Sequence, residues 1–264
     1  MGRQFVAQDM INAAEIRFTL GERNGRILLG MTVGADCSPV AFVTKPAVTL
    51  WPRCTGDGNF GSMWGPSEVS KAKYTLDLTD QSITGELPNE GFSSLAALCE
   101  AIDDSLLSFV YANQLKILGR KNLSRDEVKM LQIRSVKPKY DRNTGQHTGN
   151  SLNLSLAKFG WNGIGGKCER KINVCDSQGV VIPEGVVAPG DVVCATMFAN
   201  QVYTGVGGDK FGIHWAFEDV SVVCQRAKLE AKTEVSVFCA HQYSFAQPYA
   251  DLSETMMVAD AASA

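Results

Sequence analysis

Segment 201–226 constrains the fold of this chain more than any other stretch. Within it, large apolar side chains occupy every second position, at Phe211, Ile213, Trp215 and Phe217. Small or polar residues lie between them, and this period of two indicates a strand with one buried face. The turn before it, 205–209, contains glycines that adopt positive φ readily, so we expect a β-hairpin. The alternation restarts at Val220, which predicts a bulge in the strand.

The glycine-rich turn of this hairpin does not fit a phosphate-binding loop. Such a loop needs Gly-Lys followed by Ser or Thr and then a helix. Here Asp209 precedes Lys210, Phe211 takes the place of the hydroxyl residue, and a strand follows. Both the residue types and the context therefore exclude a nucleotide-phosphate loop at this position.

The rest of the chain predicts short antiparallel strands around one helical insertion. Alternating apolar runs predict strands at 10–20, 26–33, 42–43, 48–51, 74–78, 152–156, 172–174, 180–182, 192–199 and 235–240. Asn24-Gly25 is a strong hairpin signal between the first two. This order favours a closed or partly open antiparallel barrel over a parallel α/β sheet, with a jelly-roll sandwich as the competing architecture.

Two helices are predicted within the insertion at about 93–134. Apolar residues recur at helical spacing from Leu95 to Val110, behind a cap at Ser93 or Ser94, and Gly119 ends the segment. Ser124 and Glu127 form a capping-box pattern, which predicts a shorter second helix to about Ile133. The following stretch, 137–150, has no periodicity, so we expect a mobile polar connection.

Charge is distributed unevenly along a chain whose net charge is −3. Between Lys116 and Arg142 there are nine basic residues and three acidic ones, a net charge of +6. After Asp251 the chain carries acidic residues and no basic one. The net charge argues against a uniformly basic nucleic-acid coat, and the basic residues are concentrated in the middle of the chain, with an acidic segment at its end.

The cysteines and the N-terminal sequence favour an intracellular protein that is not secreted. The chain begins without the apolar core of a signal peptide, and its eight cysteines include no Cys-x-x-Cys pair. Several lie in apolar strand runs, so we expect buried free thiols. A zinc site at Cys168, Cys175 and either His147 or His214 is compatible with residue type only, because the spacing matches no zinc knuckle. We therefore expect no metal and no cofactor.

The C-terminal third resembles a known family. A Lys-Phe-Gly-x-x-Trp strand, formed here by Lys210, Phe211, Gly212 and Trp215, follows a long helix and a Lys-rich stretch. Val202-Tyr203 before it and Val220 and Val222 after it extend the match. This pattern is similar to the OB-fold single-stranded-DNA-binding proteins of large nucleo-cytoplasmic DNA viruses, and more distantly to the replicative single-strand binders of T-odd phages. Elsewhere the resemblance extends only to the order of elements.

The expected fold is therefore mainly β with a helical insertion (α+β): an OB-fold-like antiparallel barrel with long loops and a helix packed on one end. We expect one elaborated domain over 1–246 and a flexible, mildly acidic tail over 247–264. In the phage relatives an acidic tail competes with DNA and recruits replication proteins. The resemblance implies the same partners for this tail.

Basic and aromatic residues are interleaved in a way that suits single-strand binding, which needs cations for phosphates and rings for bases. The candidate nucleic-acid-binding residues are Phe60, Lys139, Tyr140, Arg142, Lys158, Phe159, Trp161, Lys167, Arg170, Lys171, Tyr203, Lys210 and Phe211. We expect Trp215 in the core and Trp161 exposed for stacking. Whether Phe211 lies in the core or at its rim is left open, and the basic run 116–134 lies partly on helices, where charged residues usually form a solvated face.

No catalytic residues are predicted. The three histidines lie in unrelated contexts, and the paired carboxylates are adjacent residues that point in different directions. The expected function is non-catalytic, sequence-tolerant binding of single-stranded DNA in viral replication, recombination or repair, at a replication site in the host cytoplasm or nucleus. The residues alone do not separate DNA from RNA, and a homo-oligomer is left open. The alternative is a structural or capsid-associated β-sandwich protein.

Overall fold

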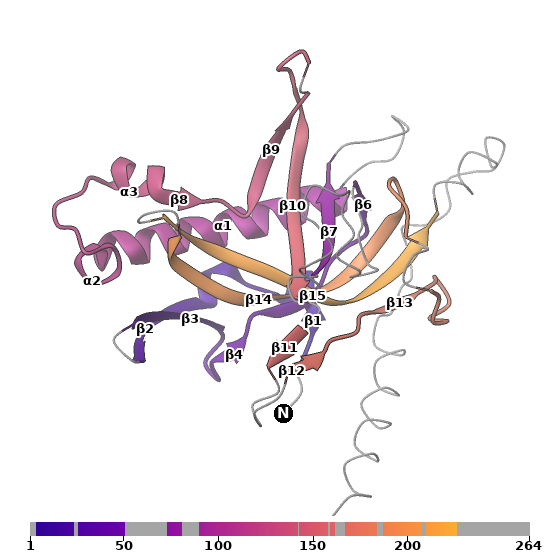
Figure 1. The fold of residues 1–264 in the computed structure, drawn as a ribbon, viewed down its shortest axis with the longest axis horizontal. Coiled ribbons are helices and arrows are strands. Elements are labelled where there is room, and N and C mark those ends of the chain that lie inside the picture. Colours follow the sequence, from indigo (N-terminus) through magenta and orange to yellow (C-terminus); the bar gives the residue numbers. More distant parts are fainter. Residues whose placement is uncertain are drawn as a thin grey trace, which may run out of the picture. The chain divides into compact units, whose positions relative to one another are not determined.

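A computed structural model gives the fold of the chain (Figure 1). The structure describes residues 4–23, 26–50, 73–80, 90–141, 143–157, 159–161, 167–183, 187–206 and 210–225. All of these belong to one compact unit, 1–226. The predicted boundary at 246, the tail 247–264 and the strand expected at 235–240 lie outside the described residues.

Most of the described elements are strands. Their bounds are β1 Val6–Ala7, β2 Ile16–Arg23, β3 Arg26–Val33, β4 Ser38–Pro39, β5 Ala41–Val43, β6 Ala47–Thr49, β7 Lys73–Thr79, β8 Gln132–Ile133, β9 Val136–Tyr140, β10 His147–Ala157, β11 Phe159–Trp161, β12 Lys167–Glu169, β13 Asn173–Cys175, β14 Val192–Val206 and β15 Lys210–Cys224. The helices are α1 Glu90–Ala112, α2 Gln114–Leu118 and α3 Arg125–Leu131, with short 3-10 turns at Gln8–Met10 and Ala13–Glu15. None of the described helices is long and apolar enough to span a membrane.

The order of the long strands describes a partly open barrel. β14 pairs antiparallel with β15 and with β6, β6 pairs with β7, and β7 pairs with β10. β10 then lies beside β15, which closes the circuit through side-chain contacts such as Ser155 Oγ to His214 Nε2 at 2.7 Å. A small antiparallel barrel of this order, with a helix inserted between two of its strands, is an OB-type fold. The predicted fold class is confirmed.

The β14–β15 hairpin is the longest ladder of the barrel, as the sequence predicts. Its pairing runs from Val192 opposite Cys224 to Val206 opposite Lys210. Gly205 has a φ of +76°, a conformation that glycine adopts without strain. Glu218 and Asp219 together oppose Thr196, so the bulge predicted before Val220 is present. The paired strands β2 and β3 also confirm the hairpin around Asn24-Gly25.

The buried face of β15 carries the core. Phe211, Ile213, Trp215 and Phe217 are all buried, and Trp215 is 2% exposed, which confirms its predicted place in the core. Its ring meets Phe42 of β5 edge-on, with centroids 6.2 Å apart. Leu76 of β7 and Leu154 of β10 close the barrel interior from the other side, each fully buried. Burying side chains of this size contributes about 1.5–3 kcal/mol each.

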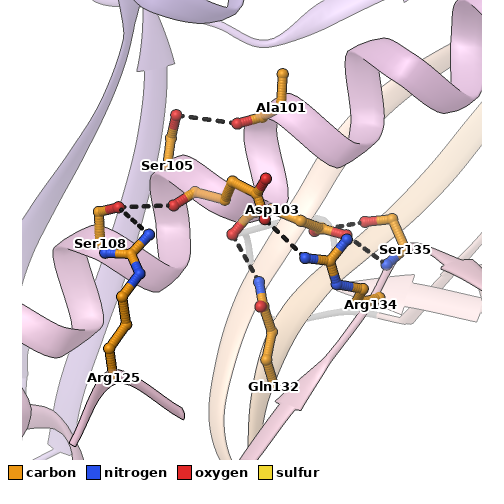
Figure 2. A network of polar contacts seen from close by, with 9 residues as sticks. Ala101, Asp103, Ser105, Ser108, Arg125, Gln132, Arg134 and Ser135 are labelled. Atoms are coloured by element: carbon orange, nitrogen blue, oxygen red, sulfur yellow. Dashed lines mark hydrogen bonds and ion pairs between the residues drawn. The ribbon is translucent and has the colours of Figure 1, made fainter. Parts of the chain in front are cut away.

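A polar network around the buried Asp103 connects helix α1 to the barrel, and Figure 2 shows its contacts with Gln132, Arg134 and Ser135. The Asp103 carboxylate accepts hydrogen bonds from the Ser135 backbone N–H at 2.7 Å and from the Ser135 hydroxyl at 2.9 Å. Trp215 Nε1 donates to the same hydroxyl at 2.8 Å. Gln132 Nε2 donates to the Asp103 carbonyl at 2.6 Å, and Arg134 pairs with Asp104 at 2.7 Å. The network therefore joins α1, the segment between β8 and β9, and β15.

The helices differ from the sequence prediction at their ends. α1 begins at Glu90, so Ser93 and Ser94 lie inside the helix and the predicted cap there is wrong. The Ser94 hydroxyl instead donates to the Gly91 carbonyl and accepts from Gln8, a tertiary contact that local sequence does not reveal. Gly119, with a φ of +67°, ends the separate short helix α2, whereas the long helix expected to run to this glycine ends at Ala112. α3 has the full capping box between Ser124 and Glu127.

Gly212 occupies a position that no larger residue fits. β8 runs parallel to β15 here, and a Cβ on Gly212 would lie 2.6 Å from the Ile133 carbonyl oxygen. The Tyr203 ring also reaches this point, with its hydroxyl oxygen 2.6 Å from the same Cβ position. The glycine thus lets the β8 backbone and the Tyr203 ring approach the same point of β15.

We predict that Gly212→Ala lowers the free energy of unfolding by about 1–3 kcal/mol, because β8 backbone and the Tyr203 ring must both move. Urea unfolding followed by tryptophan fluorescence measures this. Gly21→Ala in β2 is the matched control, since the nearest atom to its Cβ position is 3.9 Å away. Equal stabilities for the two variants would show that the β8 contact is not tight.

Burial raises the pKa of Asp103 to about 6, and the hydrogen bonds from Ser135 and the charge of Arg134 offset only part of this desolvation. The folded pKa is above the unfolded one, so the folded state binds more protons between about pH 4 and pH 6. Protonation removes the cost of burying the charge, so Asp103 favours the folded state most at low pH, and this contribution to stability falls as the pH rises through about 6. A difference of this size corresponds to about 3 kcal/mol.

We predict that the unfolding free energy of Asp103→Asn falls less between pH 4.5 and pH 7 than that of the unchanged protein. The asparagine amide can accept from the Ser135 N–H and donate to its hydroxyl, as a protonated carboxyl would. Urea unfolding at several pH values measures the difference. Parallel pH profiles for the two proteins would show that Asp103 does not cause the pH dependence of the unfolding free energy.

Candidate nucleic-acid interface

A β-hairpin extends strand β10 beyond the barrel. β9 pairs with the first residues of β10, from Tyr140 opposite His147 to Val136 opposite Leu152, and the turn 141–146 connects the two strands. We call residues 136–152 the β9–β10 arm. Figure 1 shows the arm standing away from the β14–β15 hairpin, while the other end of β10 pairs with β7 inside the barrel.

The tip of the arm is an ordered turn. The Asp141 carboxylate accepts from the backbone N–H of Asn143 at 2.9 Å and of Thr144 at 2.7 Å, and these bonds hold its pKa below the usual value. Gly145 has a φ of +68° and donates to the Asp141 carbonyl. The expectation of a mobile polar connection over 137–150 is therefore wrong: most of this stretch lies in β9 and β10, because cross-strand pairing and an Asp-capped turn need no hydrophobic period.

The arm carries exposed aromatic and basic side chains. Tyr140 is 59% exposed, and its ring meets that of His147 edge-on with centroids 5.6 Å apart. Lys137 is exposed. Lys139 is half-buried, and its ammonium lies 4.0 Å from the Asp77 carboxylate of β7. A ring that stacks on a base next to ammonium groups that contact phosphates is the arrangement that single-strand binding needs.

The arm continues into a polar outer face of the barrel. Leu154 of β10 and Leu76 of β7 point into the core. The residues that alternate with them along each strand therefore face outward. Asn153 donates to the Asp77 carboxylate at 2.5 Å across this face. Thr75 and Ser155 are paired one step further along the ladder. Sequence reasoning missed these residues as site candidates, although their alternation with the buried leucines was the available signal.

A second group of predicted residues follows the opposite end of β10. Phe159 and Trp161 lie in β11 and Lys167 in β12, and these two strands form a small antiparallel pair. The side chains of all three lie outside the described part of the structure. Beyond β12, Lys171 is exposed and Arg170 is half-buried. The Tyr74 hydroxyl donates to the Arg170 carbonyl at 3.2 Å, which fastens this segment to β7.

The third predicted group does not join the other two. Tyr203, Lys210 and Phe211 lie at the end of the β14–β15 hairpin that pairs with β8. Phe211 is fully buried, so its predicted role in stacking is wrong: it shares the core face of β15 with Trp215. The Tyr203 ring lies over Gly212, and burial together with the nearby Asp103 charge raises its pKa. Lys210 is exposed.

Three further predicted residues, Phe60, Arg142 and Lys158, lie outside the described residues. The structure therefore brings Lys139 and Tyr140 to one end of β10, and the segment from β11 to Lys171 to the other. Along the part of the chain that is described, no group of three or more His, Cys, Asp or Glu side chains is placed to hold a metal ion.

No protein-family model matches the chain, and no curated protein is similar to it in sequence. Among solved structures, the chain is similar to the single-stranded DNA binding protein gp2.5 of bacteriophage T7, at 8% identity and a TM-score of 0.47 over 77% of this chain and 100% of that one. It is also similar to the single-stranded DNA-binding protein of bacteriophage Enc34 in complex with ssDNA, at 9% identity and a TM-score of 0.38 over 79% of this chain and 96% of that one. The chain thus has distant structural similarity to phage single-stranded-DNA-binding proteins.

Proposed function

We propose that this protein binds single-stranded DNA without catalysis and with tolerance of sequence. The observation that carries this proposal is the path of β10. Its first residues pair with the exposed Tyr140 and with Lys139, and its last residue is followed by the segment that holds Phe159, Trp161 and Lys171. A strand of this length covers about 36 Å at 3.3 Å per residue, enough for several nucleotides.

The order of the strands in the barrel supports the same surface as the binding site. In OB-type barrels the outer face of the second and third strands, together with neighbouring loops, binds oligonucleotides. In the barrel of this protein β7 and β10 hold those positions, and their outer face is polar between the two groups of aromatic and basic residues. The β9–β10 arm lengthens this face by extending its third strand.

The biological role that fits this binding is protection of single strands during viral DNA replication, recombination or repair. The Lys-Phe-Gly-x-x-Trp strand, whose similarity to proteins of large nucleo-cytoplasmic DNA viruses is a resemblance of sequence pattern, supports a viral protein acting at an intracellular replication site. The acidic residues Asp251, Glu254 and Asp260 support a tail that recruits replication proteins. Both points rest on sequence alone.

The first test is binding of a labelled oligothymidylate, measured by fluorescence anisotropy at two salt concentrations. We expect binding at low salt that weakens steeply with salt, because each phosphate contact releases counterions. Replacing Lys137 and Lys139 together by Gln reduces the magnitude of the log–log salt slope by about 2, roughly 1 for each contact. Absence of binding at low salt would overturn the proposed function.

A second test separates stacking from charge. We expect Tyr140→Ala to weaken binding about 5- to 150-fold, the equivalent of ~1–3 kcal/mol for one stacked base, while the salt slope stays the same. Tyr111→Ala is the matched control, because Tyr111 is a tyrosine exposed on helix α1, away from β10. If both variants bind as the unchanged protein does, the arm makes no stacking contact.

A further inference from the structure

A row of polar side chains crosses the outer face of the barrel where β10 meets β15. His214 of β15 lies at its centre, half-buried between Ser155 of β10 and Asn200 of β14. Its Nε2 is 2.7 Å from the Ser155 hydroxyl, and its Nδ1 is 3.0 Å from the Asn200 amide nitrogen. Lys73, exposed on β7, is the charged group that acts on the imidazole. Four strands of the barrel thus each contribute one polar group.

His214 keeps its hydrogen bonds in either protonation state. A serine hydroxyl both donates and accepts, and an asparagine amide presents a donor on one side and an acceptor on the other. In the neutral ring, the Asn200 N–H donates to Nδ1 and Nε2–H donates to Ser155. If the ring gains a proton on Nδ1, rotation of the Asn200 amide turns its oxygen toward that N–H. The row therefore accommodates an imidazolium without leaving a buried polar group unpaired.

The charges around His214 are arranged so that an anion would change its protonation. Burial and the positive charge of Lys73 lower the pKa of His214 in the free protein. The other charged groups on these four strands are Asp77 of β7, which accepts from Asn153 and lies near Lys139, and Lys210, Glu218 and Asp219 of β15. An anion next to Lys73 would offset that repulsion and favour the imidazolium.

We propose that Lys73, Ser155, Asn200 and His214 form a subsite for one phosphate of a bound nucleic-acid strand, and that His214 takes up a proton from solvent when the phosphate enters. This inference rests on the proposed function, and it names residues on the strand path between the arm and the β11–β12 pair. Lys73 supplies a permanent charge, Ser155 and Asn200 supply hydrogen-bond donors, and His214 supplies a charge that appears on binding.

The test measures affinity for a rhodamine-labelled oligothymidylate at constant ionic strength between about pH 6 and pH 8. We expect the unchanged protein to bind up to about tenfold more tightly at the lower pH, the effect of raising the pKa of one group by about one unit on binding. His214→Gln, which keeps an amide but cannot be protonated, loses this gain. His147→Gln, which removes the exposed histidine of the arm, keeps it.

Each outcome decides a different point. If His214→Gln and the unchanged protein have the same pH dependence, or if His147→Gln alone removes the gain, the subsite is overturned while strand binding stands. If the unchanged protein does not bind at pH 8 and low salt, the proposed function itself fails. The NMR titration of the His214 ring protons, with and without the oligothymidylate, gives a direct check: an upward pKa shift on binding supports the subsite, and no shift overturns it.

Discussion

The hydrogen-bonded chain from Trp215 through Ser135 to Asp103 is the interaction on which the arrangement of helix and barrel depends. Trp215 lies in the core, so its indole N–H needs a partner inside the protein. Ser135 provides that partner and at the same time occupies both oxygens of a carboxylate on α1. Because Ser135 directly precedes β9, the same contact fixes where the β9–β10 arm leaves the barrel.

This network has a chemical consequence for the whole fold. A carboxylate in a dry environment is unfavourable unless donors surround it, and here the donors do not fully offset burial, so Asp103 titrates at about pH 6. Removing one partner would leave the others unpaired, which generally costs more than the hydrogen bond itself contributes. The attachment of α1 to the barrel is therefore specific, and it weakens as Asp103 loses its proton, in the pH range where histidines also titrate.

The outer face of the barrel is organised by strand β10. Its inward leucines complete the core, while its outward residues form hydrogen bonds with side chains of β7 and β15. One strand thus holds the Lys139–Tyr140 pair at one end and, at Ser155 near its other end, the His214 row, and the β11–β12 pair follows it. The backbone of β10 is paired with β9 in its first half and with β7 in its second. Such a strand suits a ligand that is itself a flexible polymer, because the protein side of the contact is already ordered.

Local sequence determined the elements whose signals are short-range. The alternation from Phe211 to Phe217 specified β15 and the burial of Trp215, and Ser124 with Glu127 specified the start of α3. The OB-type barrel also followed from element order together with the family resemblance. The sequence did not show which residues at the ends of a strand are exposed. A period of two assigns each residue to a face of the strand, but it does not show how far along the strand that face is covered.

Only the tertiary structure decided the rest. Phe211 is buried because β8 and α1 cover this end of the β14–β15 hairpin. The sequence alone did not show that other elements cover it. The arm at 136–152 depends on cross-strand pairing and on an Asp141-capped turn, neither of which produces a hydrophobic period. In the row around His214, Asn200 comes from the partner strand of the same hairpin, whereas Ser155, 59 positions away in the sequence, reaches hydrogen-bond distance only because the closure of the barrel places β10 beside β15.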